Sequence, residues 1–347
     1  MLVRLLSFGA AGLAFALASG SLGSGDAAAA EKVTWNWAIY GPPRAVTSGI
    51  EHFAKMAAEK TGGKFNIRLH YGESIVGAKD VLDAHKINSI QGALTAYSYT
   101  PGKTPLQQVL DLPYLPIPDL DAQIQVHDAY QKHPAVAAEL ARWNAFSLAT
   151  VPLPQYEFMG VGKAPQQLEG WKGKRVRAVG GLGDAMVLLG AIPTSVSAPE
   201  VYQGLERGTF DAASFPFTYS FGAYRLHEIS KWYTIGMQPG VVHNSLTVSL
   251  DAWKALPEEY RKILEEARPE HYRIMKERYA QEDAKWLPVF KAKLEEVRFT
   301  PEMFDAVKEI AGRPVWDKWV SEMEAKGLPG RELLDVVLAE AKKVSGS

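Results

Sequence analysis

A cluster of cationic side chains at the start of residues 171–217 could bind an anion. The segment begins WKGKRVRAVGG, and its cations are Lys172, Lys174, Arg175 and Arg177. Arginine suits carboxylates best, because its planar guanidinium presents two parallel donors to two carboxylate oxygens. We therefore expect an arginine of this cluster to hold an anionic ligand.

The pattern around Arg177 predicts a β-strand that ends close to this residue. Over residues 173–179, Arg175 and Arg177 point one way, and Lys174, Val176 and Ala178 point the other. Two glycines then turn the chain, and side chains at a strand end enter the crevice where open α/β sheets bind ligands. We interpret the two lysines as a solvated edge.

The motifs of common enzymes are incomplete in this sequence. The string GGLGDA lacks the third glycine of a dinucleotide loop, because Met186 stands there. The eight histidines form no HxH or HxxxH pair, and neither Ser214 nor Ser220 has a glycine elbow. We therefore expect no cofactor, no metal and no enzymatic activity.

Composition excludes further classes of protein. The chain has 347 residues, 47% of them hydrophobic and 22% charged, with a formal net charge of -1. Its basic residues are scattered, so we expect no nucleic-acid partner. The absence of cysteine excludes disulfides, thiol catalysis and thiolate metal sites.

Residues 1–30 have the composition of a secretory signal peptide. Arg4 supplies the positive charge, Leu5–Ala18 the apolar core and Ala28–Ala30 a small-residue cleavage site. The core is shorter than the roughly 20 residues of a membrane span. We expect a periplasmic protein, cleaved after Ala30.

The remaining pattern predicts an α/β fold of two lobes. Strands are expected at 32–40, 65–71 and 92–97, with helices between them, which is the opening of a doubly wound lobe. The charged segment 257–294, interrupted by Pro269, is long enough for a helix that spans both lobes.

The chain crosses between the lobes near residues 152–154, and the strand expected at 241–250 returns to the first lobe. Lobe I then comprises residues 31–153 plus 241–285, and lobe II residues 154–240 plus 286–347.

Two long strings resemble one protein family. They are FAKMAAEKTGGKFNIRLHYGESIVG, from Phe53 to Gly77, and GAxPTxxxxxEVYxxLExGxxD, from Gly190 to Asp211. Together with the strand ending in Arg177 and the long charged helix, they resemble the solute-binding proteins of TRAP (tripartite ATP-independent periplasmic) transporters, the DctP-like family. The resemblance covers nearly the whole mature chain.

The resemblance implies a fold like that of periplasmic binding proteins, with crossing strands, and a transport function. Such proteins capture a small organic acid in the cleft between the lobes and deliver it to TRAP membrane permease subunits. In members that bind carboxylates, an arginine at the matching strand end forms a salt bridge with the substrate. The matching residue here is Arg177.

The sequence departs from the family pattern at three places. Phe215 replaces an asparagine that contacts the ligand carboxylate, and Ala198 replaces an aromatic residue that packs on the ligand. A second arginine of the preceding strand is absent from residues 156–158. These changes argue against a sugar acid or a small dicarboxylate and favour a ligand with an aromatic or apolar body.

The candidate ligand-binding residues are therefore one cation, one acid and a set of mainly aromatic side chains. They are Arg177, Phe215, Tyr156, Glu157, Tyr40, Tyr97, Trp37, Ala198 and Tyr219. Further candidates for apolar walls are Trp35, Phe158 and Phe217.

Three functions follow from these residues. The leading hypothesis is a binding protein for an organic monocarboxylate, aromatic or a 2-oxo or 2-hydroxy acid. An alternative keeps the transport role with a zwitterionic osmolyte such as betaine or ectoine, caged by aromatic rings with Glu73 or Glu157. A remote alternative is an exported hydrolase or lyase with Glu157 or His243 as base.

We predict that the exported protein begins at Glu31, because signal peptidases cut after small residues such as those of Ala28–Ala30. Intact mass measurement of protein from a periplasmic fraction checks the position of the cut. A mature chain that retains the apolar segment would contradict the prediction.

Overall fold

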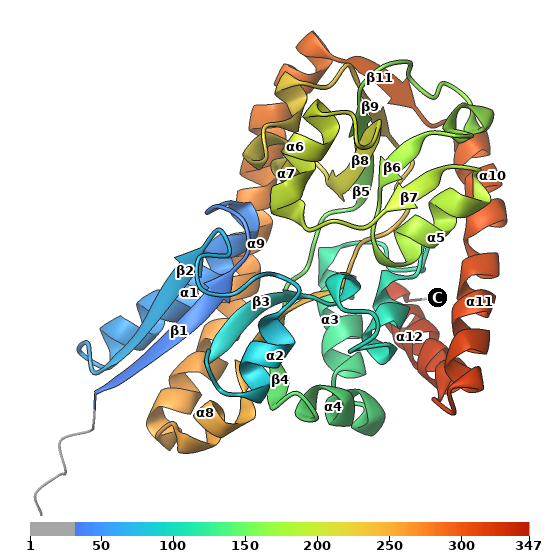
Figure 1. Cartoon of the computed structure of the whole chain (residues 1–347). Helices are drawn as coiled ribbons and strands as arrows, with labels where there is room; N and C mark the ends of the chain where they lie inside the picture. The colour runs from blue at the N-terminus through green and yellow to red at the C-terminus, as the bar shows by residue number, and fades with distance from the viewer. Residues whose placement is uncertain (1–31, 347) are drawn as a thin grey trace, which may run out of the picture. The chain divides into compact units, whose positions relative to one another are not determined.

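A computed structural model describes residues 32–346, and these form an α/β fold with two sheets (Figure 1). The predicted signal peptide lies outside the described residues. No helix within residues 32–346 is long and apolar enough to cross a membrane.

The first sheet contains the amino-terminal strands and one strand from late in the chain. Its order is β2-β1-β3-β10-β4, in which β1, β2 and β3 run parallel and β10 is antiparallel to both of its neighbours. The strands are β1 (Val33–Ile39), β2 (Phe65–Tyr71), β3 (Gly92–Ala96), β4 (Ala145–Thr150) and β10 (Asn244–Ser249). The strand expected at 241–250 forms β10 and pairs with β3 and β4.

The second sheet carries the segment that begins with the cationic cluster. Its order is β11-β9-β5-β8-β6-β7, and β6 is parallel to both β8 and β7. The strands are β5 (Tyr156–Gly160), β6 (Arg175–Arg177), β7 (Ile192–Thr194), β8 (Ala212–Pro216), β9 (Trp232–Ile235) and β11 (Glu295–Arg298). The predicted strand at 173–179 is thus shorter than expected, but it does end at Arg177.

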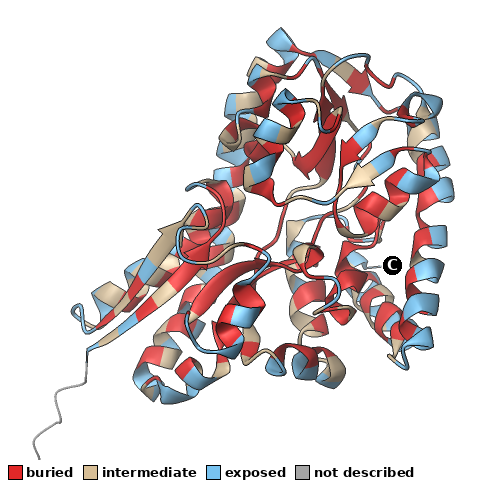
Figure 2. Cartoon of the chain, viewed as in Figure 1, coloured by how far each residue is buried: buried red, intermediate tan, exposed pale blue. Residues whose placement is uncertain are grey.

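Helices flank both sheets, and buried residues concentrate in the strands and on the helix faces that cover them (Figure 2). The helices are α1 (Ala45–Lys60), α2 (Val81–Lys86), α3 (Leu120–Tyr130), α4 (Pro134–Ala141), α5 (Gly180–Leu188), α6 (Val201–Glu206), α7 (Tyr219–Ala223), α8 (Leu250–Ala255), α9 (Glu258–Lys293), α10 (Pro301–Ala311), α11 (Arg313–Ala325) and α12 (Gly330–Ser345). Short 3-10 turns include η1 (Tyr97–Tyr99), η2 (Leu106–Asp111) and η4 (Ala198–Glu200).

The long helix α9 contacts elements of both sheets, as predicted from its length. It packs along α1 beside the first sheet and against α7 beside the second. From Tyr260 to Tyr279 its buried residues recur every three or four positions, which places them on one face. The expected interruption at Pro269 is wrong: Pro269 and Pro288 are both exposed, so water can bind the carbonyls that each proline leaves without a partner.

The segment that crosses between the sheets is fixed by side chains from neighbouring helices. Gln123 on α3 donates to Leu153 O at 3.1 Å and accepts from Leu153 N at 2.7 Å. Tyr279 on α9 donates to Pro152 O at 2.9 Å. Both anchors hold the main chain between β4 and β5, where the two sheets meet.

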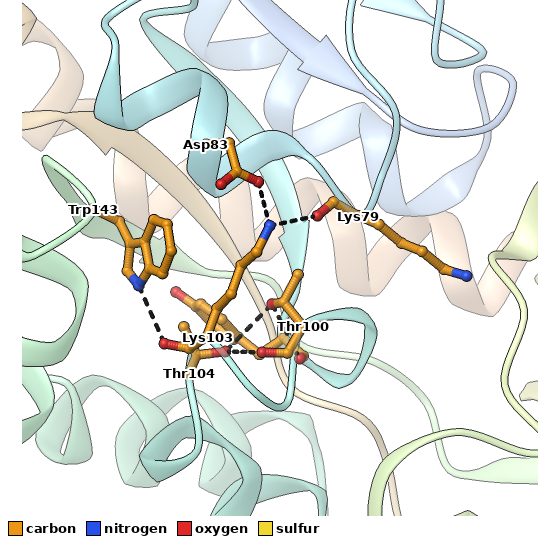
Figure 3. A network of polar contacts seen from close by, with 7 residues as sticks. Lys79, Asp83, Thr100, Lys103, Thr104 and Trp143 are labelled. Atoms are coloured by element: carbon orange, nitrogen blue, oxygen red, sulfur yellow. Dashed lines mark hydrogen bonds and ion pairs between the residues drawn. The ribbon is translucent and has the colours of Figure 1, made fainter.

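A polar network fixes the loop after η1 (Figure 3). Lys103 forms an ion pair with Asp83 and donates to Lys79 O at 3.3 Å. Trp143 donates from Nε1 to Lys103 O at 3.1 Å, and the hydroxyls of Thr100 and Thr104 lie 3.3 Å apart. The network therefore fixes the chain directly after Tyr99.

We predict that Gly49→Ala destabilises the contact between α1 and α9. A Cβ at Gly49 would lie 2.3 Å from His271 Nδ1 and 2.7 Å from His271 O. The clash should exceed the gain in helix propensity of about 1 kcal/mol and lower the free energy of unfolding by about 1–3 kcal/mol. Urea denaturation measures the difference.

The matched control is Lys55→Ala on the exposed face of α1, which should change stability by less than about 0.5 kcal/mol. A Gly49→Ala protein as stable as this control would contradict the close approach of the two helices.

Candidate functional site

Aromatic rings and two arginines line a small cavity of about 20 Å³ between the two sheets. The rings are those of Tyr40, Tyr99, Tyr156, Phe215, Tyr219 and Tyr224, and the cations are Arg44 and Arg177. Several of these residues stand at or just beyond the carboxyl ends of parallel strands: Tyr40 after β1, Tyr99 after β3 and Arg177 at the end of β6. This is where side chains of an open α/β sheet meet a ligand.

The guanidinium of Arg177 is buried and is held mainly by main-chain carbonyls. The residue is 1% exposed. Nε and Nη2 donate to Val196 O at 3.1 and 2.9 Å, and Nη1 donates to Ser214 O at 3.0 Å. None of the ion pairs among residues 32–346 includes Arg177. A buried charge without a counter-charge is costly, so the cavity favours an anion.

The neighbouring cation, Arg175, has a different environment although it lies on the same strand. Its guanidinium is about half exposed and pairs with Asp211 at 2.6 Å. Arg175 stands at the start of β6 and Arg177 at its end, so only Arg177 reaches the cavity. The strand position therefore separates a surface ion pair from a buried cation.

Tyr99 is a cavity residue that the sequence analysis missed. Its hydroxyl accepts from Arg177 Nη2 at 3.2 Å and from Ala198 N at 3.0 Å, so it joins the first sheet to the second. Within the described part of the chain its O–H has no acceptor. A carboxylate oxygen of a ligand could accept hydrogen bonds from Arg177 Nη2 and Ala198 N in place of Tyr99. The Tyr99 hydroxyl could then donate to the ligand.

Phe215 lies beside Arg177 as an apolar wall. The guanidinium carbon of Arg177 is 4.9 Å from the centre of the Phe215 ring, and Tyr224 stacks on the same ring with centroids 5.2 Å apart. Such contacts add an attraction between the cation and the ring to the burial of apolar surface. Phe215, at the position where the resemblance implies an asparagine, therefore presents an aromatic ring to the cavity.

Six of the nine candidate residues line the cavity: Arg177, Phe215, Tyr156, Tyr40, Ala198 and Tyr219. Trp37 does not, because its ring packs against Phe53 under α1, 6.1 Å between centroids. Tyr97 turns into the core and stacks on His243 at 4.9 Å.

The three further wall candidates also lie outside the cavity; Trp35 and Phe158 are buried core residues, and Phe217 is half-buried. Trp35 packs on Phe65, Phe158 on Trp171, and Phe217 on Tyr233.

Glu157, the ninth candidate, bonds within the protein instead of facing the cavity. Its carboxyl group accepts from Gly236 N at 2.8 Å and Gln238 N at 3.3 Å, and the Thr234 hydroxyl lies 2.6 Å away. Burial raises the pKa of Glu157 to about 7, and these hydrogen bonds oppose the rise only in part. Glu157 therefore fixes the loop after β9.

His243, the other base considered, is equally enclosed. Its Nδ1 lies 3.0 Å from Nδ1 of His127, and its Nε2 lies 2.7 Å from the amide nitrogen of Gln131. Burial lowers the pKa of His243 well below its ordinary value, so the ring is neutral. Neither His243 nor Glu157 lines the cavity.

Arg44, Tyr224 and Asn244 also line the cavity and were not nominated from sequence. The sequence around Arg44 did indicate a possible ligand contact. Like Arg177, Arg44 is a cation beside a strand end and a glycine-containing turn. Tyr224 and Asn244 carried no such signal. No group of three His, Asp or Glu side chains suited to a metal occurs within residues 32–346.

The family model for bacterial extracellular solute-binding proteins of family 7, DctP, matches residues 40–323. The chain is 29% identical over 245 residues to a monocarboxylate 2-oxoacid-binding periplasmic protein of Nostoc sp.; the match covers 67% of this chain and 64% of the relative, less than two thirds of its length. It is 25% identical over 272 residues to an ectoine-binding periplasmic protein of Halomonas elongata, covering 76% of this chain and 77% of the relative.

Solved structures show the same fold. A TRAP solute-binding protein from Rhodoferax ferrireducens T118, crystallised with copurified benzoate, superposes with a TM-score of 0.81 at 20% identity. The superposition covers 90% of this chain and 99% of the other. The predicted two-lobed α/β fold is confirmed by this likeness.

We predict that Glu157 makes stability fall as the pH rises from about 4.5 to 7. Its carboxyl group has a pKa of about 7 when folded against about 4.3 when unfolded. The folded state thus holds a proton that the unfolded state releases, and the stabilisation present below the lower value is lost as pH approaches 7.

Glu157→Gln should flatten this change, which amounts to up to about 4 kcal/mol, because glutamine can keep the bonds to Gly236 N and Thr234 without titrating. Urea denaturation of both proteins between pH 4.5 and 8 measures it. Parallel stability profiles for the two proteins would contradict the assignment.

Proposed function

The chain belongs to family 7 of the bacterial extracellular solute-binding proteins, and we propose that it captures an organic acid in the cavity between its sheets. The captured acid is delivered to the membrane permease subunits of a TRAP transporter. The protein works in the periplasm, after removal of the signal peptide at Ala30.

The observation that carries this proposal is the buried guanidinium of Arg177 without a counter-charge. Three carbonyl contacts orient it, and four of its five N–H donors are already used by Val196 O, Ser214 O and Tyr99. A ligand carboxylate would take the free donor on Nη1 and replace the Tyr99 hydroxyl at Nη2. Two charge-assisted bonds of this kind also neutralise the buried charge.

The walls favour a ligand whose body is aromatic or apolar. Phe215 and Tyr224 stack beside Arg177, and Tyr156 and Tyr219 complete the lining. Flat rings lose little conformational entropy on binding and pack well against such surfaces. The copurified benzoate of the Rhodoferax relative has these properties.

A zwitterionic osmolyte is the less favoured ligand, although the Halomonas relative binds ectoine. The described lining of the cavity contains two arginines and no carboxylate, and Glu73 and Glu157 lie outside it. Two cations repel the positive group of a zwitterion. An enzymatic role is disfavoured because the two bases considered, Glu157 and His243, are bonded elsewhere.

The lobes we propose are those expected from sequence, residues 31–153 plus 241–285 and residues 154–240 plus 286–347, closing over the ligand by a hinge motion. We propose one change to these lobe boundaries. Helix α12 packs on α3, so the C-terminal helix belongs with the first lobe.

We predict that Arg177→Ala weakens binding of benzoate or another organic acid about 100-fold or more, because two charge-assisted hydrogen bonds are lost. Arg177→Lys should also weaken binding, since the ammonium keeps the charge but lacks the planar fork. Isothermal titration calorimetry measures the affinities, and circular dichroism checks that each variant is folded.

Arg175→Ala is the matched control, because it removes a cation two residues away that pairs with Asp211 on the surface. Its affinity should equal that of the wild type. Undiminished binding by both folded Arg177 variants, or failure of every organic acid to bind the wild-type protein, would overturn the proposed function.

A further inference from the structure

A second guanidinium, that of Arg44, reaches the same cavity from the first sheet. Arg44 follows β1 and precedes α1, and it is half-buried. Its Nη1 donates to Tyr40 O and to Pro42 O, each at 2.8 Å. Within residues 32–346 its Nε and Nη2 have no hydrogen-bond partner, and Arg44 takes part in no ion pair. Donors on this side chain are therefore available to a ligand.

Two pairs of aromatic rings separate the two guanidiniums. In the second sheet, Arg177 lies 4.9 Å from the Phe215 ring, Phe215 stacks on Tyr224, and Arg44 lies 5.5 Å from the Tyr224 ring.

On the side of the first sheet, the Tyr99 hydroxyl accepts from Arg177, and the rings of Tyr99 and Tyr40 are 5.7 Å apart. Arg44 lies 5.0 Å from the Tyr40 ring. Each sheet thus supplies one aromatic pair between the same two cations.

The surroundings of Arg44 add to the positive potential of this part of the cavity. Arg44 is the N-cap residue of α1, a helix of 16 residues with no acid in its first turn. The N-terminus of a helix carries a partial positive charge, which favours a nearby anion. The nearest groove outside the cavity does contain Glu51 and Glu282, but neither forms an ion pair with Arg44.

A polar atom next to Arg44 also lacks a partner. The hydroxyl of Tyr224, whose ring lies 5.5 Å from the Arg44 guanidinium, is buried without a hydrogen bond within residues 32–346. Gly41 permits the close approach of Tyr224, because a Cβ there would lie 2.1 Å from the Tyr224 hydroxyl. The Tyr224 hydroxyl is thus a second donor that an anionic group at Arg44 could use.

We propose that the ligand is an aromatic dianion that bridges the two arginines. One carboxylate binds Arg177, the ring lies between the aromatic pairs, and a second anionic group, carboxylate or sulfonate, binds Arg44 and the Tyr224 hydroxyl. This inference rests on the proposed function and narrows it. It adds a second anionic group to the organic acid expected from the sequence, in which only one arginine was recognised.

Isothermal titration calorimetry with benzoate, benzene-1,3-dicarboxylate and benzene-1,4-dicarboxylate tests the proposal. At least one dicarboxylate should bind the wild-type protein about 10- to 100-fold more tightly than benzoate, the gain expected from a second charge-assisted contact. Arg44→Gln should abolish this preference, and Arg44→Lys should restore part of it because the charge is retained. Circular dichroism checks that both variants fold.

The matched control is Lys285→Gln, which removes a cation from the outer groove beside Arg44 but not from the cavity. It should keep the wild-type preference. Tight binding of benzoate with equal or weaker binding of both dicarboxylates overturns this inference and leaves the proposed function standing. A preference that survives in Arg44→Gln also overturns it. Failure of all three acids, and of every other organic acid, to bind the wild-type protein overturns both.

Discussion

The guanidinium of Arg177 is held by the carbonyls of Val196 and Ser214 in a buried cavity that supplies no carboxylate to balance it. Carbonyl oxygens orient the cation but do not cancel its charge, so the site is arranged for an anion from outside the protein. The neighbouring strands determine the position of this guanidinium. Strand β6 ends at Arg177, and the register beside β8 brings Phe215 next to it.

The hydrogen bonding of Arg177 also connects the two sheets. The Tyr99 hydroxyl, which belongs to the first sheet, accepts from Arg177 and from Ala198 in the second. The polar network around Lys103 and Trp143 holds the loop after Tyr99, and α9 packs on helices beside both sheets. A ligand whose carboxylate accepts from Arg177 Nη2 in place of the Tyr99 hydroxyl would therefore break one hydrogen bond that joins the sheets.

Local patterns in the sequence predicted the parts of the site that depend on local geometry. Alternation followed by a glycine turn identified Arg177, and the length of the charged segment 257–294 identified α9. The same signal, a cation beside a turn at a strand end, is present at Arg44 after the Gly-Pro-Pro turn, but it was not connected with a ligand. Tyr99 and Tyr224 could not be identified, because their roles arise from contacts between residues far apart in the chain.

Aromatic residues show the limit of the sequence most clearly. Trp37 and Tyr40 lie on or beside the same strand, yet only Tyr40 reaches the cavity, since α1 covers Trp37 and buries it against Phe53. Pro269 likewise predicted a helix break, whereas its exposure lets water bind the freed carbonyl and the helix continues. In both cases the surroundings of the side chain in the folded protein decide the outcome.

A crystal structure of the protein with a bound aromatic acid tests the central claim most directly. The account predicts a ligand carboxylate within hydrogen-bond distance of Nη1 and Nη2 of Arg177, with the ring beside Phe215 and Tyr99. A ligand bound at another place, or bound in this cavity with its carboxylate turned away from Arg177, would contradict the account.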